Sequence, residues 1–182
     1  MTKKTLIQFS NEDEIERLAD LAYMLKLGEG KFEMALRRAT NKTLRSYVTF
    51  ISRDVAKRAR VKMKLIKRRM KFYPAGKRHS AAYLSLIANA LPTIILDPKP
   101  SRRGVRVFGG RRYERGFVAR SSVREREAVF ERYSEQRLPL DEKYVEVESH
   151  VGQVYSGIDK QILQKFLKNF EHEIKYRGGL FG

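Results

Sequence analysis

The chain has 182 residues and no cysteine, and 39 Lys and Arg against 21 Asp and Glu give it a formal net charge of +18. The length suits one domain with a core and an extension, and the missing cysteines exclude disulfides and thiolate metal sites. The three histidines are scattered, so neither a metal site nor a cofactor is expected. The excess positive charge predicts an anionic partner, which could be nucleic acid, a membrane surface or an acidic protein.

Residues 1–30 are expected to form an N-terminal helical extension. Residues 5–9 could form a short strand, and the N-terminus lacks the apolar core of an export signal, so export is not expected. An acidic helix is predicted over residues 11–27, because three acids in its first turn suit the positive end of the helix dipole. Gly28 and Gly30 are expected to break it. No apolar run here or later in the chain is long enough for a membrane-spanning helix.

The segment from Lys31 to Lys71 predicts a long helix and is the most basic part of the chain. Between Lys31 and Ser80 there are 17 Lys and Arg but only two acids. Beyond Arg60 the helix either runs on or restarts as a short second piece. Steps of three and four are typical of a helix lying against a core, and most steps between its apolar residues have this length. These residues are Phe32, Leu36, Ala39, Leu44, Tyr47, Val48, Ile51, Val55, Ala59, and then Val61, Leu65, Ile66 and Met70.

Residues 61–71 are the strongest functional signal in the chain, at the end of a basic helix taken as residues 53–71. Charge at this density repels itself, which favours an anionic partner over the alternative of a merely solvated face. Phe72 and Tyr73 are expected to plug the end of the helix, with base stacking as the alternative. Six of the eleven positions are basic: Lys62, Lys64, Lys67, Arg68, Arg69 and Lys71.

The middle of the chain has the pattern of short strands. Residues 82–88 predict a strand, and residues 93–96 are a second short apolar run. The segment 97–104 contains two prolines, a serine and a glycine, which predicts an exposed and poorly ordered loop. Gly109 and Gly110 are typical of a hairpin turn.

Strands between Gly104 and Glu148 are expected to form one antiparallel sheet, with Phe117, Val129 and Val145 facing inward. A last helix is predicted over residues 158–177. The predicted fold class is therefore α+β: an antiparallel sheet or partial barrel packed against a long basic helix and a C-terminal helix. The expected strands have a period of two and cover four ranges: 104–108, 117–122, 127–133 and 137–148.

A second group of cations is rich in arginine, whose guanidinium makes forked contacts to phosphate or carboxylate. It consists of Arg102, Arg103, Arg106, Arg111, Arg112, Arg115 and Arg120. From both groups, nine residues are predicted to face DNA or a partner: Lys62, Lys64, Lys67, Arg68, Arg69, Arg102, Arg103, Arg111 and Arg112.

Signatures of enzymes are missing from the chain. It has no dinucleotide-binding or Walker-type glycine motif and no G-x-S-x-G elbow. The pairs Asp141–Glu142 and Glu146–Glu148 could form a metal or acid–base site, as in a nuclease, but such runs are more often a solvated surface. We therefore predict that the chain is not an enzyme.

Several short motifs in a fixed order resemble the minor tail protein Z family of lambdoid phages and prophages, the tail completion proteins. The resemblance covers about residues 31–176, and its parts are weak alone but carry weight through order and spacing. The chain has no glycine at 124–127, where the family has a glycine turn. The matching residues are Val61, Leu65, Ile66, Lys67, Arg69, Gly116, Phe117, Ala119, Arg120, Val129, Phe130, Arg132, Arg137, Pro139 and Leu140.

The resemblance implies a non-enzymatic virion protein that is assembled in the host cytoplasm, with residues 31–182 as its tail-completion domain. It implies a homo-oligomeric ring, expected to be six-fold, at the head-proximal end of the tail around the DNA channel. Partners would be the tail terminator, head-completion or connector proteins and phage DNA, with no membrane. The basic helix could face phosphate or dock on acidic neighbours. The alternative function is a monomeric nucleic-acid-binding protein that uses residues 53–71.

Overall fold

The computed structural model describes residues 12–24, 26–77, 81–120, 125–132, 134 and 138–178. It combines five α-helices with short antiparallel strands in the described part of the chain, which confirms the α+β class. The chain divides into two compact units. The expected strand at 5–9 lies outside the described residues, as do the ends of later expected strands at 121–122, 133 and 137.

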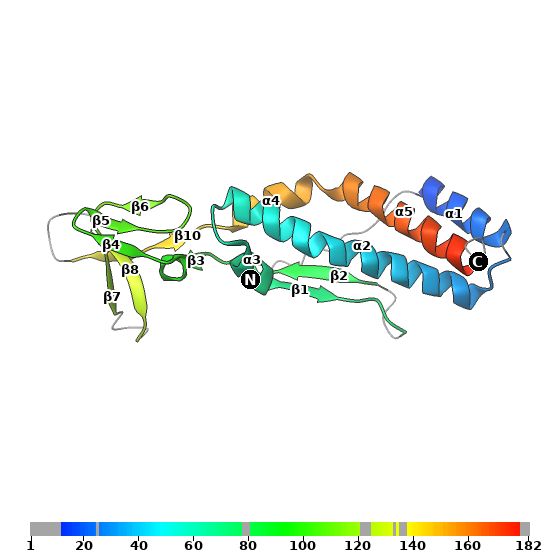
Figure 1. The fold of residues 1–182 in the computed structure, drawn as a ribbon, viewed down its shortest axis with the longest axis horizontal. Coiled ribbons are helices and arrows are strands. Elements are labelled where there is room, and N and C mark those ends of the chain that lie inside the picture. Colours follow the sequence, from blue (N-terminus) through cyan, green and yellow to red (C-terminus); the bar gives the residue numbers. More distant parts are fainter. Residues whose placement is uncertain are drawn as a thin grey trace. The chain divides into compact units, whose positions relative to one another are not determined.

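The first unit, called the helical unit here, holds the described residues up to Ile51, those from Arg69 to Ile87, and those from Val154 onward. Its helices are α1 (Glu12–Met24), most of α2 (Glu29–Arg58) and α5 (Asp159–Arg177). They lie side by side in Figure 1. Beside them is a hairpin in which β1 (Met70–Tyr73) pairs with β2 (Tyr83–Leu86).

The core of the helical unit joins small residues of α2 to aromatic residues of α5. Ala35 and Ala39 are fully buried against Phe166 and Phe170. The Phe166 and Phe170 rings are stacked with centroids 5.5 Å apart. The predicted apolar stripe of α5 is therefore confirmed. On α2 the stripe is confirmed except at Leu36, which is 37% exposed because the neighbouring Ala35 takes the inward position.

One polar contact joins α2 to α5 inside this core. The Asn169 amide donates to Thr43 Oγ1 at 2.8 Å, and the Thr43 hydroxyl donates to the Ala39 carbonyl at 2.8 Å. Both side chains are buried, so each removes the cost of burying the other's polar atoms. The pair holds the two helices at one register.

The second unit, called the strand-rich unit, holds Ser52–Arg68 and Ala88–Gln153. Besides the end of α2 and the beginning of α4 (Glu148–Ser156), it contains α3 (Met63–Arg69) up to Arg68 and a 3-10 helix, η1 (Thr93–Leu96). Its strands are β3 (Leu91–Pro92), β4 (Lys99–Ser101), β5 (Gly104–Arg106), β6 (Arg112–Tyr113), β7 (Gly116–Arg120), β8 (Glu127–Arg132), β9 (Leu140–Glu142) and β10 (Tyr144–Val145).

The expected single sheet is wrong, because these strands are divided among three antiparallel sheets: β4-β5-β6, β7-β8-β9 and β10-β3. The breaks fall where the chain turns after β6 and after β9, and β10 pairs with a strand before Gly104. Val129 and Val145 are buried as expected, whereas Phe117 is half-buried, with the Arg132 guanidinium 5.0 Å from its ring centroid.

The segment 97–104 is exposed at most positions, as expected, but the loop assignment is wrong, since most of it is a β-hairpin. β4 pairs with β5 through Lys99↔Arg106, Pro100↔Val105 and Ser101↔Gly104. Pro100 is tolerated because β4 is an edge strand. The Ser101 hydroxyl donates to the Gly104 carbonyl at 2.9 Å and closes the turn.

The predicted basic helix is divided into pieces. α2 ends at Arg58, α3 restarts at Met63, and Arg60 between them has a positive φ of 46°. The restart was one of two expected outcomes, but the helical assignment of Lys71 is wrong, because Met70 begins a strand that pairs with β2. The expected break between the first two helices is confirmed at Gly28, which lies in neither helix, whereas Gly30 lies inside α2.

Candidate functional site

The nine cations predicted to face DNA or a partner occupy the α3 region and the β4-β5-β6 sheet. On α3, Lys64, Lys67 and Arg68 are exposed, because Ile66 of the same helix is buried and turns them outward. Arg69, the last residue of α3, is half-buried, and this burial lowers the pKa of its guanidinium. On the sheet, Arg102, Arg103 and Arg112 are exposed and Arg111 is half-buried.

Two of the predicted cations are used within the strand-rich unit itself. Lys62 forms an ion pair with Asp97, and its ammonium lies 5.6 Å from the centroid of the Phe108 ring. Arg111 donates to the Ala59 carbonyl at 2.7 Å and to the Arg60 carbonyl at 3.1 Å. These carbonyls lie just beyond the C-terminal end of α2, where a cation is favourable. Both side chains therefore stabilise the corner between α2 and α3.

We expect Arg111→Gln to lower the stability of the strand-rich unit by about 1–2 kcal/mol, because it removes two charge-assisted hydrogen bonds at a helix end. In a chain of this size the thermal midpoint should fall by about 2–8 °C. The control is Arg115→Gln, an exposed arginine on the turn before β7. Equal midpoints for the two variants in a thermal unfolding experiment would contradict this role for Arg111.

A row of like charges crosses the β4-β5-β6 sheet. Lys99, Arg106 and Arg112 are paired directly with one another in the ladder, and all three are exposed. Directly opposite residues share one face of a sheet, with neighbouring strands about 4.8 Å apart. The opposite face is apolar at Val105, which is completely buried. The alternation of valine inside and arginine outside therefore produces this row, called the cationic row below.

Next to the cationic row is a hollow of about 290 Å³, called the arginine hollow below. Arg102 and Arg103 come from the β4–β5 turn, and Arg112 Nη2 donates to the Arg103 carbonyl at 3.3 Å. No ion pair among the described residues involves an arginine of this hollow. The residues that line it are Ser101, Arg102, Arg103, Arg106 and Arg112.

A further basic hollow of about 520 Å³ lies in the helical unit and was not predicted from the sequence. The spacing of Arg38, Lys42 and Arg45 by four and three was a signal for it, because it places them on one side of a helix. Arg45 lies 5.6 Å from the centroid of Phe72. Glu173 of α5 also lines this hollow, so its charge is mixed, unlike that of the arginine hollow.

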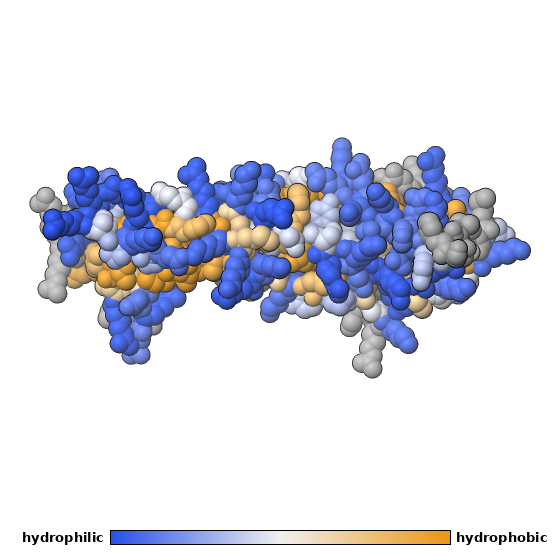
Figure 2. Space-filling model, viewed as in Figure 1, coloured by the Kyte–Doolittle hydropathy of each residue, from blue (hydrophilic) through white to orange (hydrophobic). Residues whose placement is uncertain are grey.

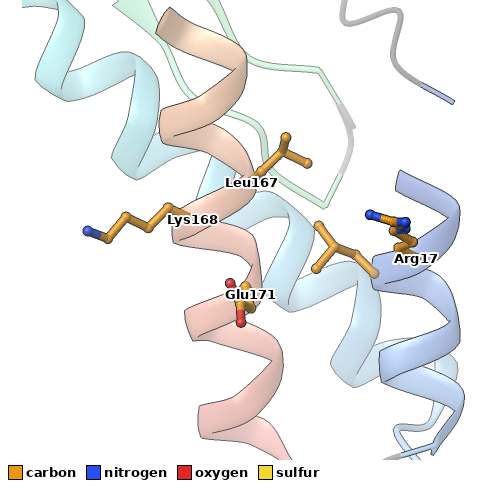
Figure 3. A pocket seen from close by; sticks show the side chains of 5 residues that line it. Arg17, Leu167, Lys168 and Glu171 are labelled. Atoms are coloured by element: carbon orange, nitrogen blue, oxygen red, sulfur yellow. The ribbon is translucent and has the colours of Figure 1, made fainter. Parts of the chain in front are cut away.

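The third hollow, of about 270 Å³, lies between α1 and α5. Figure 3 shows Arg17 on α1 and Leu167, Lys168 and Glu171 on α5. Glu171 accepts from Lys175 at 2.6 Å, so its carboxylate already has a cationic partner on the same helix. The hollow has the mixed lining of a groove between two packed helices.

The aromatic residues after α3 lie in the β1-β2 hairpin and do not plug a helix end. Phe72 is half-buried, and Tyr73 stacks on Tyr83 with ring centroids 4.4 Å apart. Tyr73 remains 38% exposed. Part of the Tyr73 ring is therefore accessible to solvent.

The acidic pairs are held by neighbouring side chains. Asp141 accepts from Lys143 at 2.8 Å, which with Glu131 raises the pKa of Lys143. Glu142 pairs with Arg126 at 3.0 Å. In the described residues, no group of three or more His, Asp or Glu side chains could hold a metal ion.

Glu146 and Glu148 were expected to share a strand. They do not, because the last strand ends at Val145. Glu146 accepts from the Ser149 hydroxyl at 2.6 Å and from the Ser149 backbone N–H at 2.7 Å, and these bonds lower the pKa of Glu146. It therefore caps α4, a helix that was not predicted, which begins at Glu148.

Apolar side chains are also exposed on the strand-rich unit, where Figure 2 shows an apolar area bordered by hydrophilic side chains. Such exposure is typical of surfaces that contact other proteins. No helix in the described part of the chain is long and apolar enough to cross a membrane. The exposed apolar residues of this unit include Ile95, Phe108, Leu138, Leu140 and Tyr144.

The family model described as prophage minor tail protein Z (GPZ) matches residues 24–180 of the chain. The match begins at the last residue of α1 and ends beyond α5, so it includes segments of both units and the arginine hollow. No curated protein and no solved structure matches the chain.

Proposed function

Because the chain belongs to the prophage minor tail protein Z family, we propose that it acts as a tail completion protein at the neck of the virion. Membership makes it a structural protein of a phage tail, in contact with other virion components. In the proposal, copies form a ring, expected to be six-fold, at the head-proximal end of the tail. The ring joins the tail terminator to the head-completion or connector proteins around the DNA channel, and it is assembled in the host cytoplasm.

Two surfaces support this proposal besides the family. The exposed apolar residues of the strand-rich unit suit contacts with neighbouring virion proteins. The exposed cations of α3 suit phosphate or acidic neighbours, and a ring would repeat them in every subunit. The division into an extension, residues 1–30, and a tail-completion domain, residues 31–182, stays a prediction.

Replacing Lys64, Lys67 and Arg68 with glutamine tests the role of α3. All three are exposed, so the triple variant should fold. In a phage that lacks the wild-type gene, we expect this variant to lose most infectious particles, because charges that set docking or meet phosphate are gone. The measurement is infectious titre, with electron microscopy of tails.

The matched control replaces Lys31, Lys160 and Lys165 with glutamine. All three are exposed, and replacing them removes the same amount of charge from other parts of the chain. It should complement the deletion as well as the wild-type gene does. Fully infectious particles from the α3 variant would show that the charge of α3 has no role in assembly.

Size-exclusion chromatography with light scattering, with and without the tail terminator, tests the ring. A closed oligomer, formed alone or with the terminator, is the expected result. A monomer under both conditions that binds nucleic acid would favour the alternative of a monomeric nucleic-acid-binding protein.

A further inference from the structure

We propose that the β4-β5-β6 sheet binds the phosphodiester backbone of nucleic acid through the cationic row and the arginine hollow, without reading base sequence. Five cations form this site: Lys99, Arg102, Arg103, Arg106 and Arg112. That the nucleic acid is the phage genome rests on the proposed function, whereas the binding itself is a property of the sheet.

The cationic row is electrostatically unfavourable for the sheet that contains it. Like charges placed directly opposite on neighbouring strands destabilise a sheet. Here three of them follow one another across all three strands, Lys99↔Arg106↔Arg112. Within the described residues, Arg102 and Arg106 form neither an ion pair nor a side-chain hydrogen bond. The missing partner of this row is therefore an anion that the described residues do not supply.

The arginines of the hollow also have donors of a shape that suits phosphate. Arg102, Arg103, Arg106 and Arg112 line one hollow, and the guanidinium group of an arginine offers a planar fork of N–H donors. Such forks bind the two free oxygens of a phosphate in a bidentate manner. The alternation along β5 directs Arg106 away from the buried Val105, toward solvent.

The lining of the arginine hollow favours nucleic acid over an acidic protein. The core of a protein interface can contain arginine, but it combines arginine with aromatic or methionine anchors and is otherwise poor in charges. The arginine hollow is lined by four arginines and one serine, with no apolar residue. Interfaces with nucleic acid are polar and strongly positive, and phosphate contacts supply most of the sequence-independent affinity. The composition of the hollow fits a phosphodiester backbone.

The test compares the full-length protein with the double variant Arg102→Gln/Arg106→Gln. Binding to a labelled duplex of mixed sequence is followed by fluorescence anisotropy at several salt concentrations. Each phosphate contact contributes about 0.9 to the magnitude of the slope of log K against log salt. With two contacts removed, the slope of the variant should be shallower by about 1.8. Near 0.15 M salt, this corresponds to affinity that is about thirtyfold weaker. A second mixed-sequence duplex should give the same constants.

The control is Lys160→Gln/Lys165→Gln, which removes two exposed cations from α5. Its affinity should stay within about twofold of the wild type, because screened charges outside the site contribute little. Thermal unfolding provides a second readout. Since Arg106 faces like charges, Arg102→Gln/Arg106→Gln should unfold at the wild-type temperature or above it.

Four results would overturn the proposal. The first is a wild-type protein that does not bind the duplex at low salt. The second is an equal loss of duplex affinity in the α5 control. The third is a loss of duplex affinity in Lys64→Gln/Lys67→Gln while Arg102→Gln/Arg106→Gln binds normally. The fourth is that poly-glutamate binds the wild-type protein as tightly as DNA does and that Arg102→Gln/Arg106→Gln loses this binding. Such a result would assign the site to acidic proteins. If the duplex binds as expected but a phage lacking the gene completes its tails, the site stands and the proposed function is wrong.

Discussion

Replacing Gly104 with alanine is expected to disrupt the β4-β5-β6 sheet and, with it, the binding of polyanions. Gly104 begins β5 with a φ of +107°, and an added Cβ would lie 2.0 Å from the Tyr113 carbonyl oxygen. Both the backbone strain and the clash with main-chain atoms destabilise the folded state, together by about 3–5 kcal/mol. The measurements are thermal unfolding and duplex binding.

Gly110→Ala is the matched control for this substitution. Gly110 also has a positive φ, +77°, but no atom lies within 4 Å of the position of an added Cβ. It should therefore show the strain alone, about 1 kcal/mol, and retain binding. Similar losses in the two variants would mean that the close approach of Gly104 to the Tyr113 backbone contributes nothing.

In the helical unit, the largest loss is expected from Phe170→Ala. Phe170 is completely buried, stacks on Phe166, and meets the edge of Phe32 with ring centroids 5.5 Å apart. The substitution leaves a cavity in the core that joins α2 to α5, at a cost of about 3–5 kcal/mol. For a chain of this length, the thermal midpoint should fall by about 6–20 °C.

The comparison for Phe170 is Tyr176→Ala, on the same helix but 57% exposed. An exposed substitution away from special features usually changes stability by less than about 0.5 kcal/mol. Comparable thermal midpoints for the two variants would show that the burial of Phe170 does not stabilise the core. Circular dichroism at 222 nm measures both.

The elements that could be predicted from the sequence are those defined by local periodicity. The stripes through Ile51 and Phe170 identified α2 and α5, because residues three and four apart share a helix face. A period of two was also expected from Glu127 to Arg132; β8 is present there, but the neighbouring Ala128 and Val129 are both buried, so the strand does not alternate strictly. The outward direction of Lys64, Lys67 and Arg68 followed from the same principle, since apolar neighbours take the inward positions.

What could not be predicted depends on partners that are distant in sequence. Lys99 to Ser101 have the composition of a loop and form a strand only because β5 pairs with them. In the sequence, nothing distinguishes Arg111 from an unpaired surface cation, because its acceptors at Ala59 and Arg60 lie 52 and 51 residues away. The hollow around Arg38 and Arg45 also requires Glu173, which comes from another helix.

The contact between Thr43 and Asn169 joins residues 126 positions apart. At a synthesis rate of about 5–20 residues per second, a ribosome needs roughly 6–25 s to make the intervening chain. All of the strand-rich unit, up to Gln153, is translated in that interval. The face of α2 that holds Ala35 and Ala39 therefore lacks its partners Phe166 and Phe170 until α5 emerges, so the core of the earliest helices is completed late in synthesis.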